Sequence, residues 1–268
     1  PGFVNGYHFC SVTFRHVHHA HTKISFYSNE DFNPDTVVVA DATGFNVDDT
    51  VMIYCVKGAT IGTGNSIYQP GDEIYDAGWD AQDPRNTGRY AFLLVSEKIG
   101  NSLVLNATIN PEIVNMGPGE VAQLVRVRSF RYANVTAAGL TAPGWDPATG
   151  TGGIVALFVH GVLRLDGDID VSGKGLKGAQ GSTDVIYSNG CSSQDTMNYY
   201  EPFYLENELW AGLKGEGITD TMFHYTRGKA SSINGGGGGN GYLSGGGGGS
   251  NYSVGVRGGD ESSSCTGT

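Results

Sequence analysis

Two uninterrupted blocks of five glycines, residues 235–239 and 245–249, constrain the fold of this chain more than any other feature. Collagen needs glycine at every third position with abundant proline, and residues 228–268 contain no proline. A flexible linker fits the composition, whereas two such blocks in near-identical context favour extended backbones packed side by side through close N–H···O and Cα–H···O contacts. Because ordering glycine is entropically costly, we expect a polyglycine layer that is ordered only when docked on neighbouring strands.

Glycine also divides the chain: 12 of the 43 glycines lie in residues 1–138 and 31 lie in residues 139–268. We therefore predict a strand-like lead-in over residues 1–33, a compact β-barrel or sandwich over residues 34–138, and a β-helix-like, glycine-rich domain over residues 139–268. We expect the chain to be a piece of a longer protein.

The first half contains short β-branched runs bounded by Gly, Pro, Asn and Asp, a pattern typical of strands and turns. No window shows an apolar stripe with the 3.6-residue helical period. The sequence thus predicts an all-β fold with strands at residues 36–40, 50–56, 90–95, 102–105 and 121–127.

The second half opens with two apolar runs, residues 152–159 and 162–171, joined by a His160-Gly161 step. Such runs are typical of successive short rungs of a β-helix, each burying one face against the next. Residues 182–211 are polar and aromatic with few glycines, which indicates an excursion from these rungs.

Three alternating aspartates, Asp166, Asp168 and Asp170, would point the same way on a strand. Such a row could bind calcium, could assist proton abstraction from a uronic acid in a β-helix lyase beside Arg164 or Lys174, or could be a solvated strand face. The third reading turns the intervening apolar residues inward, namely Leu165, Ile169 and Val171.

Aromatic residues concentrate in the excursion. Their rings offer stacking surfaces for sugars or form the local core of that segment. The candidate glycan contacts are Tyr199, Tyr200, Tyr204 and Trp210.

Five of the seven histidines cluster near the N-terminus. His16 and His18 would share a strand face at a spacing that suits a transition metal, but we favour an exposed histidine cluster at the edge of a strand. The five are His8, His16, His18, His19 and His21.

The four cysteines are far apart and form no CxxC pair, which removes the usual zinc and thioredoxin spacings. Two disulfides, in any of three connectivities, suit an exported protein, and buried thiols are the alternative. The candidates are Cys10, Cys55, Cys191 and Cys265.

The formal net charge of −11 argues against nucleic acid as a partner, because phosphate binding needs a basic surface. No apolar run is long enough for a membrane helix. GxSxG elbows, P-loops and dinucleotide-binding glycine motifs are missing. We therefore expect no enzymatic activity, no membrane span in this segment and no cofactor other than calcium.

The order of several motifs resembles one family over roughly residues 34–260. These motifs are VVVADATGF (37–45), VDDTVMI (47–53), AQLVRV (122–127), GTGGIVALFV (150–159), IDVSGKG (169–175) and both glycine blocks. Together they are similar to the opening module of the large repetitive cell-surface adhesins of gliding Bacteroidota, which the type 9 secretion system exports.

The resemblance implies an extracellular, surface-displayed, non-catalytic adhesin or filament component that attaches to surfaces or polysaccharide and serves gliding motility. Its implied partners are other copies or later repeats of the same protein, polysaccharide, and the secretion machinery during export. The family usually carries Asn or a small residue at the positions of Asp166 and Asp168, which favours the solvated face. A β-helix polysaccharide lyase and a carbohydrate-binding module remain the alternative functions.

Overall fold

The computed structural model describes residues 12–14, 20–28, 36–61, 81–109, 117–181, 206, 211–222, 224–228, 232–239, 245–250, 255–256 and 258. Every regular element in these residues is a β-strand, which confirms the all-β prediction. The chain forms two compact units. The first contains Pro1–Tyr54, Arg89–Asn115 and Ala122–Gly175, and the second contains Cys55–Gly88, Met116–Val121 and Leu176–Thr268. The domain boundaries drawn from composition remain predictions.

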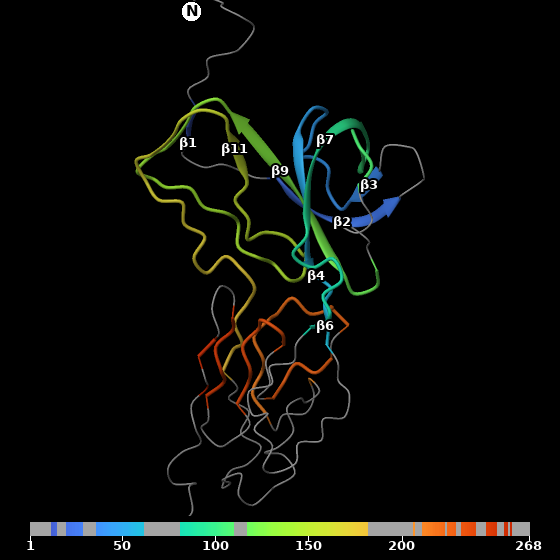
Figure 1. Cartoon of the computed structure of the whole chain (residues 1–268), viewed down its shortest axis with the longest axis vertical. Helices are drawn as coiled ribbons and strands as arrows, with labels where there is room; N and C mark the ends of the chain where they lie inside the picture. Colours follow the sequence, from blue (N-terminus) through green and yellow to red (C-terminus); the bar gives the residue numbers. More distant parts are fainter. Residues whose placement is uncertain are drawn as a thin grey trace, which may run out of the picture. The chain divides into compact units, whose positions relative to one another are not determined.

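Six strands close a β-barrel (Figure 1), in the order β9-β2-β3-β8-β7-β4 with β4 pairing back to β9. β2 pairs antiparallel with β3 and β9, β3 with β8, and β7 with β4 and β8. The barrel includes β2, which comes from the predicted lead-in. The strands are β2 (His21–Ser28), β3 (Thr36–Val39), β4 (Thr50–Lys57), β7 (Tyr90–Ile99), β8 (Ser102–Leu105) and β9 (Val121–Phe130).

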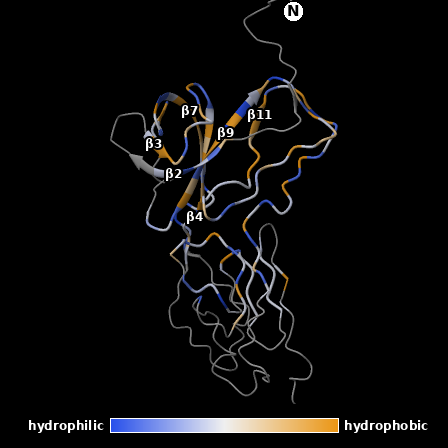
Figure 2. Cartoon of the chain, turned by 180° about the vertical axis from the view of Figure 1, so that it is seen from behind, coloured by the Kyte–Doolittle hydropathy of each residue, from blue (hydrophilic) through white to orange (hydrophobic). Residues whose placement is uncertain are grey.

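The barrel core follows from strand alternation. Val37 and Val39 on β3 and Leu103 and Leu105 on β8 are all buried, because residues two apart point to the same face. β9 is buried on both faces over most of its length, and Figure 2 shows hydrophobic and hydrophilic positions alternating toward its end. Its outer face packs beneath residues 154–156 in a cluster of Met52, Val125, Val127, Tyr54, Ile154 and Ala156.

A buried glutamine fixes this covering segment. The Gln123 side-chain amide donates from Nε2 to the Gly152 carbonyl over 3.1 Å and accepts from the Gly152 N–H over 3.0 Å. Gly152 has φ = 103°, a backbone conformation that favours glycine. The two bonds satisfy a polar side chain that is only 1% exposed, as burial requires.

Parallel pairs extend the first unit beyond the barrel. β11 (Leu157–Val159) pairs with the end of β9. β10 (Ala133–Val135) lies between β1 (Val12–Phe14) and β12 (Leu163–Leu165) in a parallel three-stranded sheet. The side chains form a second apolar cluster of Ala133, Val135, Leu140, Phe130, Val155, Leu157 and Val159.

Residues 152–159 and 162–171 do not pair with each other, and their assignment to the rungs of a β-helix stays a prediction. β11 and β12 belong to different sheets. Leu157 is the register partner of Arg128, and Leu163 is the partner of Ala133. The chain turns at Gly161, where a Cβ would crowd the Arg131 carbonyl. A local apolar pattern identifies strands, but their partners come from earlier in the chain.

The second unit contains an antiparallel pair, β5 (Thr60–Ile61) with β6 (Ala81–Asp83). Ala59 bridges Thr219 in parallel, and Leu213 bridges Arg227 antiparallel. Within the described parts of both units, no helix is long and apolar enough to cross a membrane.

Candidate functional site

The predicted aspartate row is not a strand face, because β12 ends at Leu165, directly before the first aspartate. Asp166 accepts hydrogen bonds from Arg164 Nε at 2.7 Å and from Asn134 Nδ2 at 3.1 Å. These bonds, that from Arg164 foremost, lower the pKa of Asp166. Hydrogen bonds from Ser172 likewise lower the pKa of Asp170. The apolar residues expected to turn inward are exposed, at 58% for Leu165, 42% for Ile169 and 41% for Val171.

Nowhere in the described ranges do three His, Cys, Asp or Glu side chains gather closely enough to hold a metal ion. Calcium binding at Asp166, Asp168 and Asp170 stays a prediction.

Most other predicted site residues lie outside the described residues. These are Tyr199, Tyr200, Tyr204, Trp210, Cys10, Cys191, Cys265, His8, His16, His18 and His19. Cys55 is buried in β4, and the disulfide pairing stays a prediction. His21 lies on β2 with its Nδ1 3.1 Å from Gln123 Oε1, and burial lowers its pKa.

Sequence reasoning missed a group of exposed aromatic rings in the first unit. On β7, Tyr90 is 57% exposed and Phe92 is 43% exposed, and strand alternation places both on one face. On β11, Leu157 and Val159 pack in the apolar cluster. Alternation therefore turns Phe158 outward, where it is 36% exposed.

These rings form a continuous row that we call the aromatic platform, made of Tyr90, Phe92, Phe158 and His160. Tyr90 and Phe92 meet edge to face with centroids 5.6 Å apart. Phe92 and Phe158 are 5.0 Å apart in a tilted arrangement. His160 stacks on Phe158 at 6.5 Å. Edge-to-face and offset contacts of this kind are favourable, so the rings hold one another in place at the surface.

Polar groups adjoin the aromatic platform. Ser129 is the register partner of Phe158, and its Oγ lies 2.8 Å from His160 Nε2. Ser129 also lines a shallow depression of about 280 Å³. The other lining residues are Asp48, Asp49, Thr50, Arg126, Val127, Arg128 and Phe130. The exposed rings of the platform thus lie beside hydrogen-bonding side chains of both charges.

In the second unit, glycine segments far apart in sequence are joined by backbone hydrogen bonds. Gly212 N–H donates to the Gly239 carbonyl and Gly215 N–H to the Gly236 carbonyl, both over 2.7 Å. Gly238 N–H donates to the Gly228 carbonyl over 2.7 Å. Further backbone bonds run from Ser250 to Asn234 and from Gly248 to Val256.

The described glycines of the two blocks serve close approach. A Cβ at Gly238 would overlap the Gly212 carbonyl oxygen, and a Cβ at Gly246 would overlap that of Gly237. The only second-unit glycines with positive φ among those described are Gly58, Gly88, Gly119 and Gly228, all outside the blocks. The block positions therefore need glycine for space, because a backbone atom, unlike a flexible side chain, cannot swing away.

A lysine is buried between these segments. Lys214 is 8% exposed, and its Nζ donates to the Gly228 carbonyl over 2.9 Å. Burial lowers the pKa of Lys214 from its ordinary 10.5 to about 7, because a low-dielectric surrounding disfavours the charged form.

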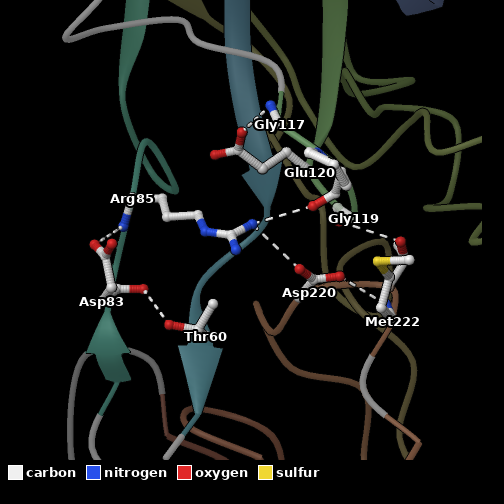
Figure 3. Close-up of polar contacts among 10 residues, drawn as sticks. Thr60, Asp83, Arg85, Gly117, Gly119, Glu120, Asp220 and Met222 are labelled. Carbon is white, nitrogen blue, oxygen red and sulfur yellow. Dashed lines mark hydrogen bonds and ion pairs between the residues drawn. The ribbon is translucent and has the colours of Figure 1, made fainter.

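A group of polar contacts around Arg85 joins several turns of the second unit (Figure 3). Arg85 Nη1 donates to Asp220 Oδ2 over 3.2 Å and to the Pro118 carbonyl over 3.1 Å. Asp220 Oδ1 in turn accepts from the Met222 N–H over 2.6 Å. Gly119, with φ = 83°, leaves room for the Asp220 carboxylate, which a Cβ would overlap. These side chains are occupied with one another and with backbone, so the cluster positions the turns.

Comparison with known proteins gives little that bears on function. No family model matches the chain, and no curated protein matches it. One solved structure with some likeness is the gp54 tailspike of Acinetobacter baumannii bacteriophage AP22, in complex with an A. baumannii capsular saccharide. It shares 15% sequence identity with this chain at a TM-score of 0.24, and the match covers 56% of this chain and 22% of the tailspike. At that level the likeness supports no conclusion about fold or activity.

Proposed function

We propose that this chain is a non-catalytic part of an extracellular adhesin or surface filament. In this proposal the second unit is a stiff polyglycine layer, the parallel strands of the first unit are the rungs of a short β-helix-like stalk, and loops and surfaces contact polysaccharide. Export by type 9 secretion, display at the cell surface, a part in gliding, and assembly with other copies or later repeats belong to the proposal through the sequence resemblance.

The observation that carries the proposal is the hydrogen bonding between glycine backbones, with no room for a side chain at Gly238 or Gly246. Glycine loses more conformational freedom on folding than any other residue. A segment that holds ten glycines in two blocks in one arrangement gains stiffness from this packing, a property that suits a mechanical element.

Amide hydrogen exchange on the intact chain tests the polyglycine layer. We expect slow exchange for the donors that bond to carbonyls of other segments, Gly212, Gly215, Gly238 and Gly248. Gly178 and Gly181, which have open space around them, are the internal reference. Exchange in the blocks as fast as at these two glycines would overturn the layer.

Adhesion is tested on polysaccharide-coated surfaces, with release of reducing ends or unsaturated products measured in parallel. Attachment without product supports the adhesin. If the chain degrades an acidic polysaccharide and Asp168→Asn abolishes this activity, the protein is a polysaccharide lyase and the adhesin proposal is wrong.

A further inference from the structure

We propose that the aromatic platform of Tyr90, Phe92, Phe158 and His160 is a binding site for a neutral polysaccharide chain. The inference deepens the proposed function, on which it rests, by naming a site and a class of ligand. It concerns residues other than the aromatic ones to which the sequence pointed.

These rings are costly to leave in water. Burying a large apolar side chain stabilises a protein by about 1.5–3 kcal/mol, yet three neighbouring aromatic rings keep between 36% and 57% of their surface exposed. Contiguous exposed apolar surface of this kind marks interaction sites in soluble proteins.

The rings of the platform are held rigidly. Phe92 belongs to a ten-residue barrel strand, and Phe158 to a strand whose neighbouring side chains, Leu157 and Val159, are fixed in an apolar cluster. Ring contacts at 5.0–6.5 Å restrict the rotamers further. A ligand that lies along the row therefore binds without the entropic cost of ordering the side chains.

The chemistry of the platform matches that of a sugar ring. The π faces of aromatic rings carry partial negative charge and attract the weakly positive C–H groups of one face of a sugar ring. The sugar hydroxyls need both donors and acceptors at the margin. His160 in the row and Ser129 beside it supply both, and Asp48 and Arg128 supply them in the adjoining depression.

Charge selects a neutral polymer. The depression is lined by two aspartates and two arginines, so its formal charges cancel. The chain as a whole has a net charge of −11, which repels a polyanion at low ionic strength. A polyol without charge fits this balance.

The same residues disfavour a protein partner. Charged residues are depleted from the centre of protein interfaces, because removing them from water is costly unless they are paired. Arg128 is exposed, and its guanidinium makes no ion pair or hydrogen bond with another residue that the structure describes. A second copy of the chain on this surface is accordingly an outcome that the experiment must detect.

Affinity electrophoresis of the full chain tests the site, with hydroxyethylcellulose, laminarin and dextran as neutral polymers and alginate as the acidic one. We expect retardation by at least one neutral polymer. Phe92→Ala and Phe158→Ala each weaken it roughly tenfold, because each loses one stacking surface, and Phe92→Trp retains it. Ile99→Ala is the matched control, since Ile99 is a 62% exposed apolar residue at the far end of the same strand.

Three results would overturn the site: retardation that Phe92→Ala and Phe158→Ala leave unchanged, equal or stronger retardation by alginate, or concentration-dependent dimerisation in ultracentrifugation that Phe92→Ala abolishes. Circular dichroism shows that each variant is folded. If the variants still attach to polysaccharide-coated surfaces as the native chain does, this site is wrong and the adhesin stands. If the native chain attaches to no polysaccharide-coated surface, the proposed function is wrong.

Discussion

The interiors of the two units are stabilised in opposite ways. The barrel of the first unit fills its interior with branched side chains that are fully buried, such as Val37, Leu103 and Leu105. The glycine segments of the second unit meet through backbone atoms with no room for a side chain. In the first case stability comes from buried apolar area. In the second it comes from hydrogen bonds and close backbone contact. Removing atoms should therefore damage the first unit, and adding atoms should damage the second.

Truncation of the barrel core is expected to have the largest effect. Leu103→Ala leaves a cavity among fully buried side chains, which costs about 2–5 kcal/mol. Urea unfolding followed by hydrogen exchange measures the loss in the barrel strands. Ile99→Ala, at an exposed position, is the control. Equal loss from both variants would show that the barrel is not held by its side-chain core.

Addition of one methyl group to a glycine block is expected to have the next largest effect. Gly238→Ala forces the Gly212 carbonyl to move, and overpacking of this kind costs about 1–3 kcal/mol. We expect faster amide exchange at Gly212 and Gly215 in this variant. Gly178→Ala adds the same atoms in open space and should leave exchange unchanged. If the two variants behave alike, the contrast between the units fails.

The buried lysine predicts a smaller, pH-dependent difference. The folded-state pKa of Lys214 is about 7 and its ordinary value is 10.5. Between these values the unfolded chain binds a proton that the folded chain lacks, so the free energy of unfolding rises with pH. Below pH 7 both states are protonated and the full cost of burying the charge remains.

We expect the second unit to gain about 1–2 kcal/mol between pH 7 and pH 9, measured by hydrogen exchange at several pH values after correction for intrinsic rates. Lys214→Met should remove this slope, and Lys177→Met, at an exposed position, should keep it. A slope that persists in Lys214→Met would assign the pH dependence to another group.

Five of the six barrel strands could be predicted from sequence, because an apolar and β-branched run bounded by turn residues is a local property, visible in residues 90–95 and 121–127. Pairing is not local. Nothing near Leu163 indicates that its partner is Ala133. The end of β12 before Asp166 also depends on that pairing, so the aspartate row could not be judged from its spacing alone.

The aromatic platform illustrates the same limit. Tyr90, Phe92 and Leu94 share one face of β7, while Ala91, Leu93 and Val95 share the other. Both faces are apolar, so alternation does not reveal which one faces the barrel interior. Closure of the barrel decides this, since Val95 is buried and Phe92 is exposed. The sequence signal for the exposed rings was therefore an apolar strand either of whose faces could be the outer one.

The Gln123 side chain makes with Gly152 the donor and acceptor pair that a strand neighbour would make. It thus substitutes for a missing peptide group where the covering segment passes over the outer face of β9. A glutamate of the same shape has no N–H to offer, so Gln123→Glu would set a carboxylate against the Gly152 carbonyl. The covering segment would then be attached to β9 most weakly at neutral and alkaline pH, where the introduced glutamate is ionised.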